Sequence, residues 1–239
     1  MSLWQSDQAL VLASRSPSRR AMLEAAGIPI EVCIPDLDER AVEAAAGICR
    51  PAEAAALLAR EKAKAVARFM PQRIVIGADQ TLALEDRRFD KPRDRAGARE
   101  QLMALAGKTH YLHSAVAVAR DGNVLFDATD TASLTLRNLS GSFLDRYLDT
   151  VGGAVLECVG AYQLEKIGIH LFDRIEGDHF TILGLPLLKL LGFLRQNGSL
   201  AAYLPPCPPG VAKGWRRQRG GHWSHRIHRH GQIHHGAIF

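Results

Sequence analysis

Long apolar runs and clustered cysteines are absent from this sequence of 239 residues. No stretch of about 18 apolar residues occurs, and the start, MSLWQSDQAL, lacks a charged segment followed by an apolar one. We therefore expect neither a membrane span nor a signal peptide. The four cysteines share no CxxC spacing, which argues against a zinc site or a disulfide framework. At 47% hydrophobic composition we expect a globular protein, and the scattered cysteines suit a reducing cytoplasm.

Acidic residues are missing from the last part of the chain. The segment 204–239 has six lysines and arginines, no aspartate or glutamate, and six of the ten histidines, which leaves 24 basic and 25 acidic residues upstream. It opens with PPCPPG and shows no amphipathic periodicity, so we expect a folded domain at 1–203 and an appendage without fixed structure at 204–239. A metal-binding histidine tract or a nucleic-acid-binding arm is the alternative, and we expect no nucleic-acid partner.

Strand and helix patterns alternate along the first 203 residues. Short apolar strands are expected at 9–13, 30–34 and 73–77. Helices are expected at 18–26, 51–69, 95–105, 140–149 and 186–196. The alternating segment 110–119 leads into the turn sequence DGN and a second strand from residue 124, which is typical of a hairpin. This pattern predicts an α/β fold with a mixed sheet.

The segment SRSPSRR, residues 14–20, lies between the first strand and the first helix. Ser16 is expected at the N-cap and Pro17 at the first helical position. The free backbone N–H groups of the first turn would then lie beside Arg19 and Arg20, and oriented donors with guanidinium groups suit a phosphate. An ordinary capped helix with solvated arginines is the alternative.

Acidic and basic residues also follow other strands. Asp79 comes directly after the strand 73–77, and a carboxylate at the carboxyl edge of an α/β sheet can hold a divalent cation or orient a water molecule. A turn cap is the alternative for Asp79. The acids of DLDE, residues 36–39, and Lys91 are expected on loops. Together these groups suit a metal–polyphosphate ligand.

Several motifs in this order carry a resemblance to a known family. They are SRSPSRRAML, DLDER, EKA, GADQT, DKP, VGAYQLEKIGI, IEGD and GLP, within residues 10–196. On these motifs the chain resembles the Maf family of nucleoside triphosphate pyrophosphatases. The resemblance implies an elongated, two-lobed α/β fold with a central cleft, similar to inosine triphosphate pyrophosphatases. It also implies hydrolysis of a nucleoside triphosphate to the monophosphate and diphosphate with Mg²⁺ or Mn²⁺, house-cleaning of non-canonical nucleotides, a homodimer and a link to septum formation.

The resemblance also implies roles for individual residues. Asp79 corresponds to the catalytic aspartate that accepts a proton, and Glu39 to a carboxylate that helps Asp79 to hold the metal. Residues implied to bind the phosphates are Ser14, Ser16, Arg19, Arg20, Lys62 and Lys91. Fixed cations and a metal suit this reaction, because attack of water at the α-phosphorus builds charge on the phosphoryl oxygens.

Three positions in the family bear on the choice of base, and here they are Ser18, Gln80 and Glu165. Family members acting on dTTP and UTP tend to have Arg, Thr and Gln there, whereas 7-methyl-GTP members have a bulky aromatic residue, Gln and Glu. The chain follows the second pattern except at Ser18, which cannot stack on a base. We expect a modified purine such as 7-methyl-GTP. Hydrolysis of dTTP and UTP, a broad nucleotide range, and a non-catalytic nucleotide-binding regulator of cell division are the alternatives.

Overall fold

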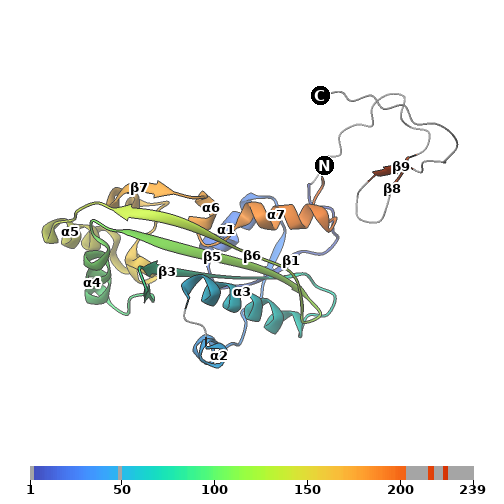
Figure 1. The fold of residues 1–239 in the computed structure, drawn as a ribbon, viewed down its shortest axis with the longest axis horizontal. Helices are drawn as coiled ribbons and strands as arrows, with labels where there is room; N and C mark the ends of the chain where they lie inside the picture. The colour runs from blue at the N-terminus through green and yellow to red at the C-terminus, as the bar shows by residue number, and fades with distance from the viewer. Residues whose placement is uncertain (1–2, 48–49, 203–214, 218–222, 226–239) are drawn as a thin grey trace, which may run out of the picture.

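One long, twisted sheet runs through the centre of the molecule (Figure 1). The computed structural model describes residues 3–47, 50–202, 215–217 and 223–225. The strands of this sheet are β1 (Leu10–Ala13), β2 (Ile30–Val32), β3 (Val75–Leu84), β4 (Arg87–Phe89), β5 (Thr109–Arg120), β6 (Asn123–Leu136) and β7 (Phe172–Glu176). Their order is β2-β1-β3-β5-β6-β7, with β4 paired to β3. Strands β2, β1 and β3 are parallel and the other pairs antiparallel, which confirms the mixed α/β sheet.

Helices cover both faces of the sheet and one of its ends (Figure 1). They are α1 (Pro17–Ala25), α2 (Glu39–Ala46), α3 (Pro51–Ala67), α4 (Arg95–Leu105), α5 (Gly141–Val151), α6 (His179–Ile182) and α7 (Leu187–Gln196). Three 3₁₀ segments, η1 (Gly152–Leu156), η2 (Val159–Ala161) and η3 (Ile167–Leu171), lead from α5 to β7. None of the helices in the described ranges is both long and apolar enough to cross a membrane.

The hydrophobic core consists of three clusters. Two lie on opposite faces of the sheet, and the third lies farther along its length. Helices α1 and α7 pack with β1 and β3 on one face, around Leu12, Leu23 and Leu190. On the opposite face lies α3, whose alanines contact Val11 and Val75. A third cluster, formed mainly by β5, β6, α4 and α5, fills the far end of the elongated molecule. The cavity described below lies where these clusters meet, as expected of two lobes with a cleft between them.

Two predictions about element boundaries were wrong. The segment 36–39 is not only a loop, because the side chain of Asp38 accepts a hydrogen bond from the Ala41 N–H and caps α2, which begins at Glu39. Strand β3 does not end at Gly77 but continues to Leu84, because β5 pairs with it over that whole length. Strands β4 and β7, helices α2 and α6 and the 3₁₀ segments were not predicted.

The predicted appendage at 204–239 lies mostly outside the described residues. Within it the structure describes two short strands, β8 (Trp215–Arg217) and β9 (Trp223–His225), which pair with each other. The absence of fixed structure in this segment stays a prediction. The predicted domain at 1–203 contains every other described element.

Candidate active site

The segment 14–20 forms the cap of α1 that the sequence predicts. Ser16 has extended backbone angles, its Oγ accepts a hydrogen bond from the Arg19 N–H at 3.4 Å, and Pro17 occupies the first turn. The Ser16 N–H in turn donates to Ser14 Oγ at 3.2 Å. The N-terminus of α1 therefore lies directly after β1, with its dipole favouring an anion at this edge of the sheet.

Arg19 is buried and connects three elements at this point. Its Nε donates to the Gly184 carbonyl at 2.8 Å, and its Nη1 donates to the Ala78 carbonyl at 2.8 Å and to Ser14 Oγ at 3.1 Å. Nη2 makes no hydrogen bond to another described residue. Burial lowers the pKa of Arg19 from its ordinary value, while the carboxylates of Asp79 and Glu39 oppose that change.

A lysine joins the two carboxylates predicted to be functional. Lys62 Nζ lies 2.6 Å from Asp79 Oδ1 and 2.9 Å from Glu39 Oε1. The side chains of Lys62 and Asp79 are each 11% exposed, whereas that of Glu39 is 50% exposed. Burial raises the pKa of Asp79 above its ordinary value, and the charges of Lys62 and Arg19 partly offset that rise. Asp79 is therefore a buried carboxyl group whose ionisation depends on its cationic neighbours.

The sheet opens at Asp79 because one of its strands ends there. The parallel pairing of β1 with β3 stops at Ala13 and Gly77, while β5 continues beside β3 for several residues more. The chain turns away from the sheet at Ser14, so Asp79 lies just beyond the carboxyl end of β1. Ligands of open α/β sheets bind at this kind of edge.

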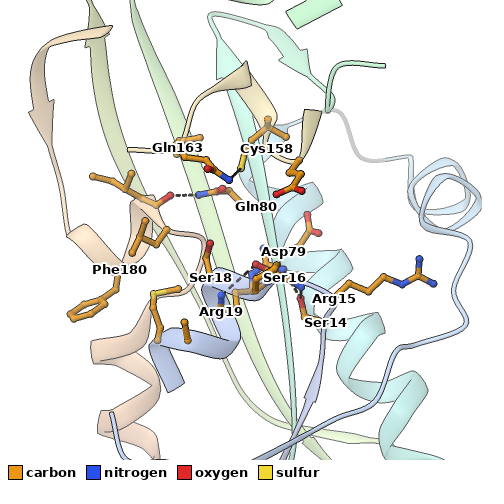
Figure 2. A pocket seen from close by; sticks show the side chains of 18 of the residues that line it. Ser14, Arg15, Ser16, Ser18, Arg19, Asp79, Gln80, Cys158, Gln163 and Phe180 are labelled. Carbon is orange, nitrogen blue, oxygen red and sulfur yellow. Dashed lines mark hydrogen bonds between the residues drawn. The ribbon is translucent and has the colours of Figure 1, made fainter. Parts of the chain in front are cut away.

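A cavity of about 1440 Å³ contains this group of residues (Figure 2). Of the predicted site residues, it is lined by Ser14, Ser16, Ser18, Arg19, Glu39, Lys62, Asp79, Gln80, Lys91 and Glu165. Arg20 is the exception: it does not line the cavity, and its Nε pairs with Glu24 on the exposed side of α1 at 2.8 Å. The geometry thus brings ten of the predicted residues together and separates Arg20 from them.

Glu39 and Asp79 are the two carboxylates of this group that could take part in holding a metal. Both contact Lys62 Nζ, and this ammonium group occupies the position next to them. In the described part of the chain no three His, Cys, Asp or Glu side chains form a metal-binding group. Mg²⁺ suits two carboxylates, because it commonly combines one or two protein carboxylates with phosphate oxygens and water.

The cavity also has lining residues to which the sequence analysis gave no role, although Tyr162 and Gln163 lie within the motif VGAYQLEKIGI. Gln163 and Cys158 lie above Gln80 in Figure 2, and Phe180 lies to the left in this view. Tyr162 also lines the cavity. Single aromatic and amide side chains have no local signal in a sequence, since the 3₁₀ segments and α6 bring them to the cavity only through the tertiary fold.

This chain is similar in sequence to curated proteins that are named pyrophosphatases. A protein from Rhodopseudomonas palustris (strain CGA009), named nucleoside triphosphate pyrophosphatase, is 54% identical over 201 residues, which is 84% of this chain and 100% of that protein. A Rhizobium etli protein named 7-methyl-GTP pyrophosphatase is 50% identical over 194 residues, 80% of this chain and 97% of that protein. A solved nucleoside-triphosphatase, or dITP/XTP pyrophosphatase, from Mycobacterium abscessus matches with 15% identity and a TM-score of 0.35, over 79% of this chain and 94% of its own.

The match to a family model covers the whole of the described cavity. The family described as Maf-like protein matches residues 9–197, a range that includes every cavity-lining residue. The resemblance drawn from the short motifs is thus confirmed by the full-length comparison. This chain belongs to the Maf-like protein family.

Proposed function

We propose that this protein is a hydrolase that cleaves a nucleoside triphosphate to the monophosphate and diphosphate. The observation that carries the proposal is the buried Asp79 carboxylate, held by Lys62 at 2.6 Å beside the N-terminus of α1 and the buried Arg19. A carboxylate and two cations at a helix N-terminus provide both a proton acceptor and a binding site for a polyphosphate. The names of the two curated relatives support the same reaction.

The phosphates would bind at the cationic side of the cavity. Arg19 offers Nη2, Lys62 lies deep in the cavity, and the exposed Lys91 lies at its surface. The backbone N–H groups at the start of α1 add oriented donors. These fixed groups would stabilise the charge that grows on the phosphoryl oxygens during attack by water.

Asp79 would accept a proton from the attacking water, and its ionised form is required for that step. Lys62 and Arg19 favour this form against the effect of burial. Glu39 and Asp79 would hold Mg²⁺ or Mn²⁺, which, when bound, supplies Lewis-acid stabilisation of the phosphoryl oxygens. Arg20 is not placed among the phosphate-binding residues, because it points away from the cavity and pairs with Glu24.

We propose a modified purine such as 7-methyl-GTP as the preferred substrate. Gln80 and Glu165 line the same cavity, and the exposed carboxylate of Glu165 suits a cationic base. The Rhizobium etli relative, which is named for this substrate, is 50% identical. Removal of non-canonical nucleotides is the cellular role that fits such a substrate. The homodimer, the cytoplasmic location and the link to septum formation stay predictions.

A panel of nucleotides tests the reaction, the metal and the base together. The purified protein is incubated with GTP, 7-methyl-GTP, ATP, dTTP, UTP and CTP, each with Mg²⁺, with Mn²⁺ or with EDTA, and diphosphate release is measured. We expect metal-dependent release of diphosphate, fastest from 7-methyl-GTP. Preference for dTTP and UTP would contradict the proposed base, and tight binding of nucleotides without turnover would favour a non-catalytic regulator.

A further inference from the structure

Helix α2 carries Glu39 to the cavity, although it buries little of its own surface. All eight of its residues are described, none of them is fully buried, and Val42 and Glu43 are the two that are partly covered. The helix lies beside α3 at the edge of the molecule (Figure 1). Most helices of globular proteins are held by a buried apolar face, which α2 does not have. Polar contacts must therefore contribute much of what keeps Glu39 at the cavity.

Two ion pairs attach α2 to the walls of the cavity. Glu39 and Glu43 are four residues apart, so they lie on the same face of the helix. Glu39 pairs with Lys62 of α3 at 2.9 Å. Glu43 pairs with Arg88 of β4, whose Nη1 donates to both carboxylate oxygens, at 2.9 and 2.8 Å. Lys62 and Arg88 both line the cavity.

The two ion pairs differ in what a substrate would do to them. Lys62 and Glu39 belong to the proposed reaction site, so a phosphate at the ammonium group, or a metal at the carboxylate, would compete with their pairing. The pair of Arg88 with Glu43 has no part in that exchange. Its side chains are 32% and 24% exposed, and charged hydrogen bonds to both oxygens of one carboxylate hold it more firmly than a single exposed contact. It therefore keeps α2 attached while the first pair is replaced by contacts with the substrate.

Strand β4 gives this contact a firm support. Arg88 lies opposite Ala83 of β3 in the antiparallel pairing of the two strands. Phe89, the next residue, is buried in the hydrophobic core, and the guanidinium carbon of Arg87 lies 4.5 Å from the centre of its ring. Arg88 thus connects a helix at the edge of the molecule to a strand that is fixed in the core.

We propose, resting on the function proposed above, that Arg88 is a positioning residue that acts through Glu43 to hold α2, and with it Glu39, at the cavity. Without this ion pair α2 loses its attachment to β4, and Glu39 lies at the cavity in a smaller fraction of the molecules. The apparent affinity for a ligand falls in proportion to the fraction of molecules that can bind it. The loss should concern the ligand that needs Glu39, which is a nucleotide together with its divalent metal.

The test compares binding with and without the metal. The nucleotides are α,β-methylene-GTP and α,β-methylene-UTP, which resist cleavage between the first two phosphates, and their dissociation constants are measured by calorimetry with Mn²⁺ and with EDTA. The proteins are the wild type, Arg88→Met, Glu43→Gln, Glu39→Gln and the double variant of Glu39→Gln with Arg88→Met. Arg99→Met is the control, because Arg99 forms a similar pair with Asp145 at 2.8 Å, between α4 and α5, and does not line the cavity. Hydrogen exchange of the α2 amides is measured in the same proteins.

We expect Arg88→Met and Glu43→Gln to weaken binding with Mn²⁺ about fivefold or more and to speed up the exchange of the α2 amides. Binding in EDTA should be unchanged or slightly tighter, because without a metal the Glu39 carboxylate repels the phosphates. In the Glu39→Gln background, Arg88→Met should change binding with Mn²⁺ by less than about twofold, since its effect passes through Glu39. Arg99→Met should behave as the wild type.

Three results would overturn the inference. They are an equal loss of binding with Mn²⁺ and with EDTA, which would assign Arg88 to direct contact with the nucleotide, a further large loss in the Glu39→Gln background, and unchanged exchange of the α2 amides in Arg88→Met. Absence of diphosphate release from every nucleotide by the wild type would instead refute the proposed function, and the exchange of the α2 amides would still report whether Arg88 holds the helix.

Discussion

At the residue scale, the proposed chemistry depends on the carboxylate of Asp79. Replacing Asp79 by Asn keeps the shape of the side chain but removes its charge and its ability to accept a proton. We expect kcat to fall by about 100-fold or more, while the fold is retained. Diphosphate release and the near-UV circular dichroism spectrum are the measurements. Activity within a few-fold of the wild type would remove Asp79 from its proposed role.

The pH dependence of activity reports how burial and the neighbouring charges set the pKa of Asp79. Burial raises its pKa and Lys62 lowers it, so the acid limb of kcat/KM should lie at a higher pH than for an ordinary aspartate. In Lys62→Met the lowering contribution is lost. We therefore expect the acid limb to move upward by about one pH unit or more. The measurement is a pH profile of kcat/KM for each protein.

Lys64 provides the matched control for this profile. It lies on the same helix as Lys62 but pairs with Glu61 at 2.6 Å, away from Asp79. Lys64→Met should leave the acid limb where the wild type has it. An identical acid limb in all three proteins would show that Lys62 does not control the ionisation of Asp79.

The sequence analysis identified most of these residues but did not predict the directions of their side chains. Ser16 and Pro17 have local signals for a helix start, and the structure confirms them. Arg19 and Arg20 are adjacent and chemically identical, yet about 100° apart around the helix. The packing of α1 against β3 decides that Arg19 enters the cavity and Arg20 pairs with Glu24. The helical spacing offers a signal that separates them: Arg19 precedes the apolar Met22 and Leu23 by three and four residues, whereas Arg20 has Glu24 four residues later.

At the scale of elements, the close contact of α3 with β3 positions Lys62 beside Asp79. A Cβ atom at Gly77 would lie 2.1 Å from the Ala59 carbonyl oxygen and 2.5 Å from the Ala63 nitrogen, both backbone atoms of α3. The absence of a side chain at Gly77 thus lets α3 approach the strand. Lys62, next to Ala63, therefore reaches Asp79, two residues beyond Gly77.

Gly77→Ala tests this contact. We expect the free energy of unfolding to fall by about 3 kcal/mol, because backbone atoms of α3 must move, and kcat to fall as Lys62 shifts. Urea denaturation and diphosphate release are the measurements. The control is Gly192→Ala on α7, where an added Cβ meets no atom within 4 Å and stability should be unchanged or slightly higher. Equal stability of the two variants would contradict the account.

A buried histidine links β5 to the 3₁₀ segment η2. His110 Nε2 and the Tyr162 hydroxyl are 2.6 Å apart, and His110 is completely buried. Burial lowers the pKa of His110 to about 4. Because the unfolded chain binds a proton at its ordinary pKa of about 6.5, the folded state loses stability as the pH falls from there toward 4.

His110→Gln should remove this pH dependence. The stability difference between the wild type and the variant should shrink by about 3 kcal/mol between pH 7 and pH 4, at about 1.4 kcal/mol for each pKa unit. Urea denaturation across that range is the measurement. His113→Gln, on the same strand but partly exposed, should change the slope less. Parallel pH dependences of the wild type and His110→Gln would contradict the prediction.

Elements with a local signal were predicted, and those that depend on tertiary pairing were not. The spans 51–69 and 95–105 are rich in strong helix formers, and α3 and α4 occupy them closely. The predicted strand ends at Gly77 because GADQT contains polar residues. In the structure, pairing with β5 keeps β3 extended beyond that point, and Asp79 is buried. The segment 152–171 contains glycines and no regular period, so its three 3₁₀ segments had no pattern to reveal them.

At the scale of the whole molecule, the two ends of the described domain lie together. The Ala201 N–H donates to the Leu3 carbonyl at 2.8 Å, and Trp4 forms a bridge with Leu200. Leu200 is buried against the cluster that contains α1 and α7. The chain therefore completes its packed domain a few residues after residue 197, where the match to the family model ends.

This closure predicts that residues after Ala202 are dispensable for catalysis. A chain ended after Ala202 keeps the contacts of Leu3 and Leu200, so its kcat/KM should stay within about twofold of the full chain and its melting temperature within a few degrees. A chain ended after Asn197 loses the bridge between Trp4 and Leu200 and should melt several degrees lower. The measurements are diphosphate release and thermal unfolding of the full chain and of the two truncated chains. A tenfold loss of kcat/KM in the first truncation would show that the basic, histidine-rich segment takes part in the reaction.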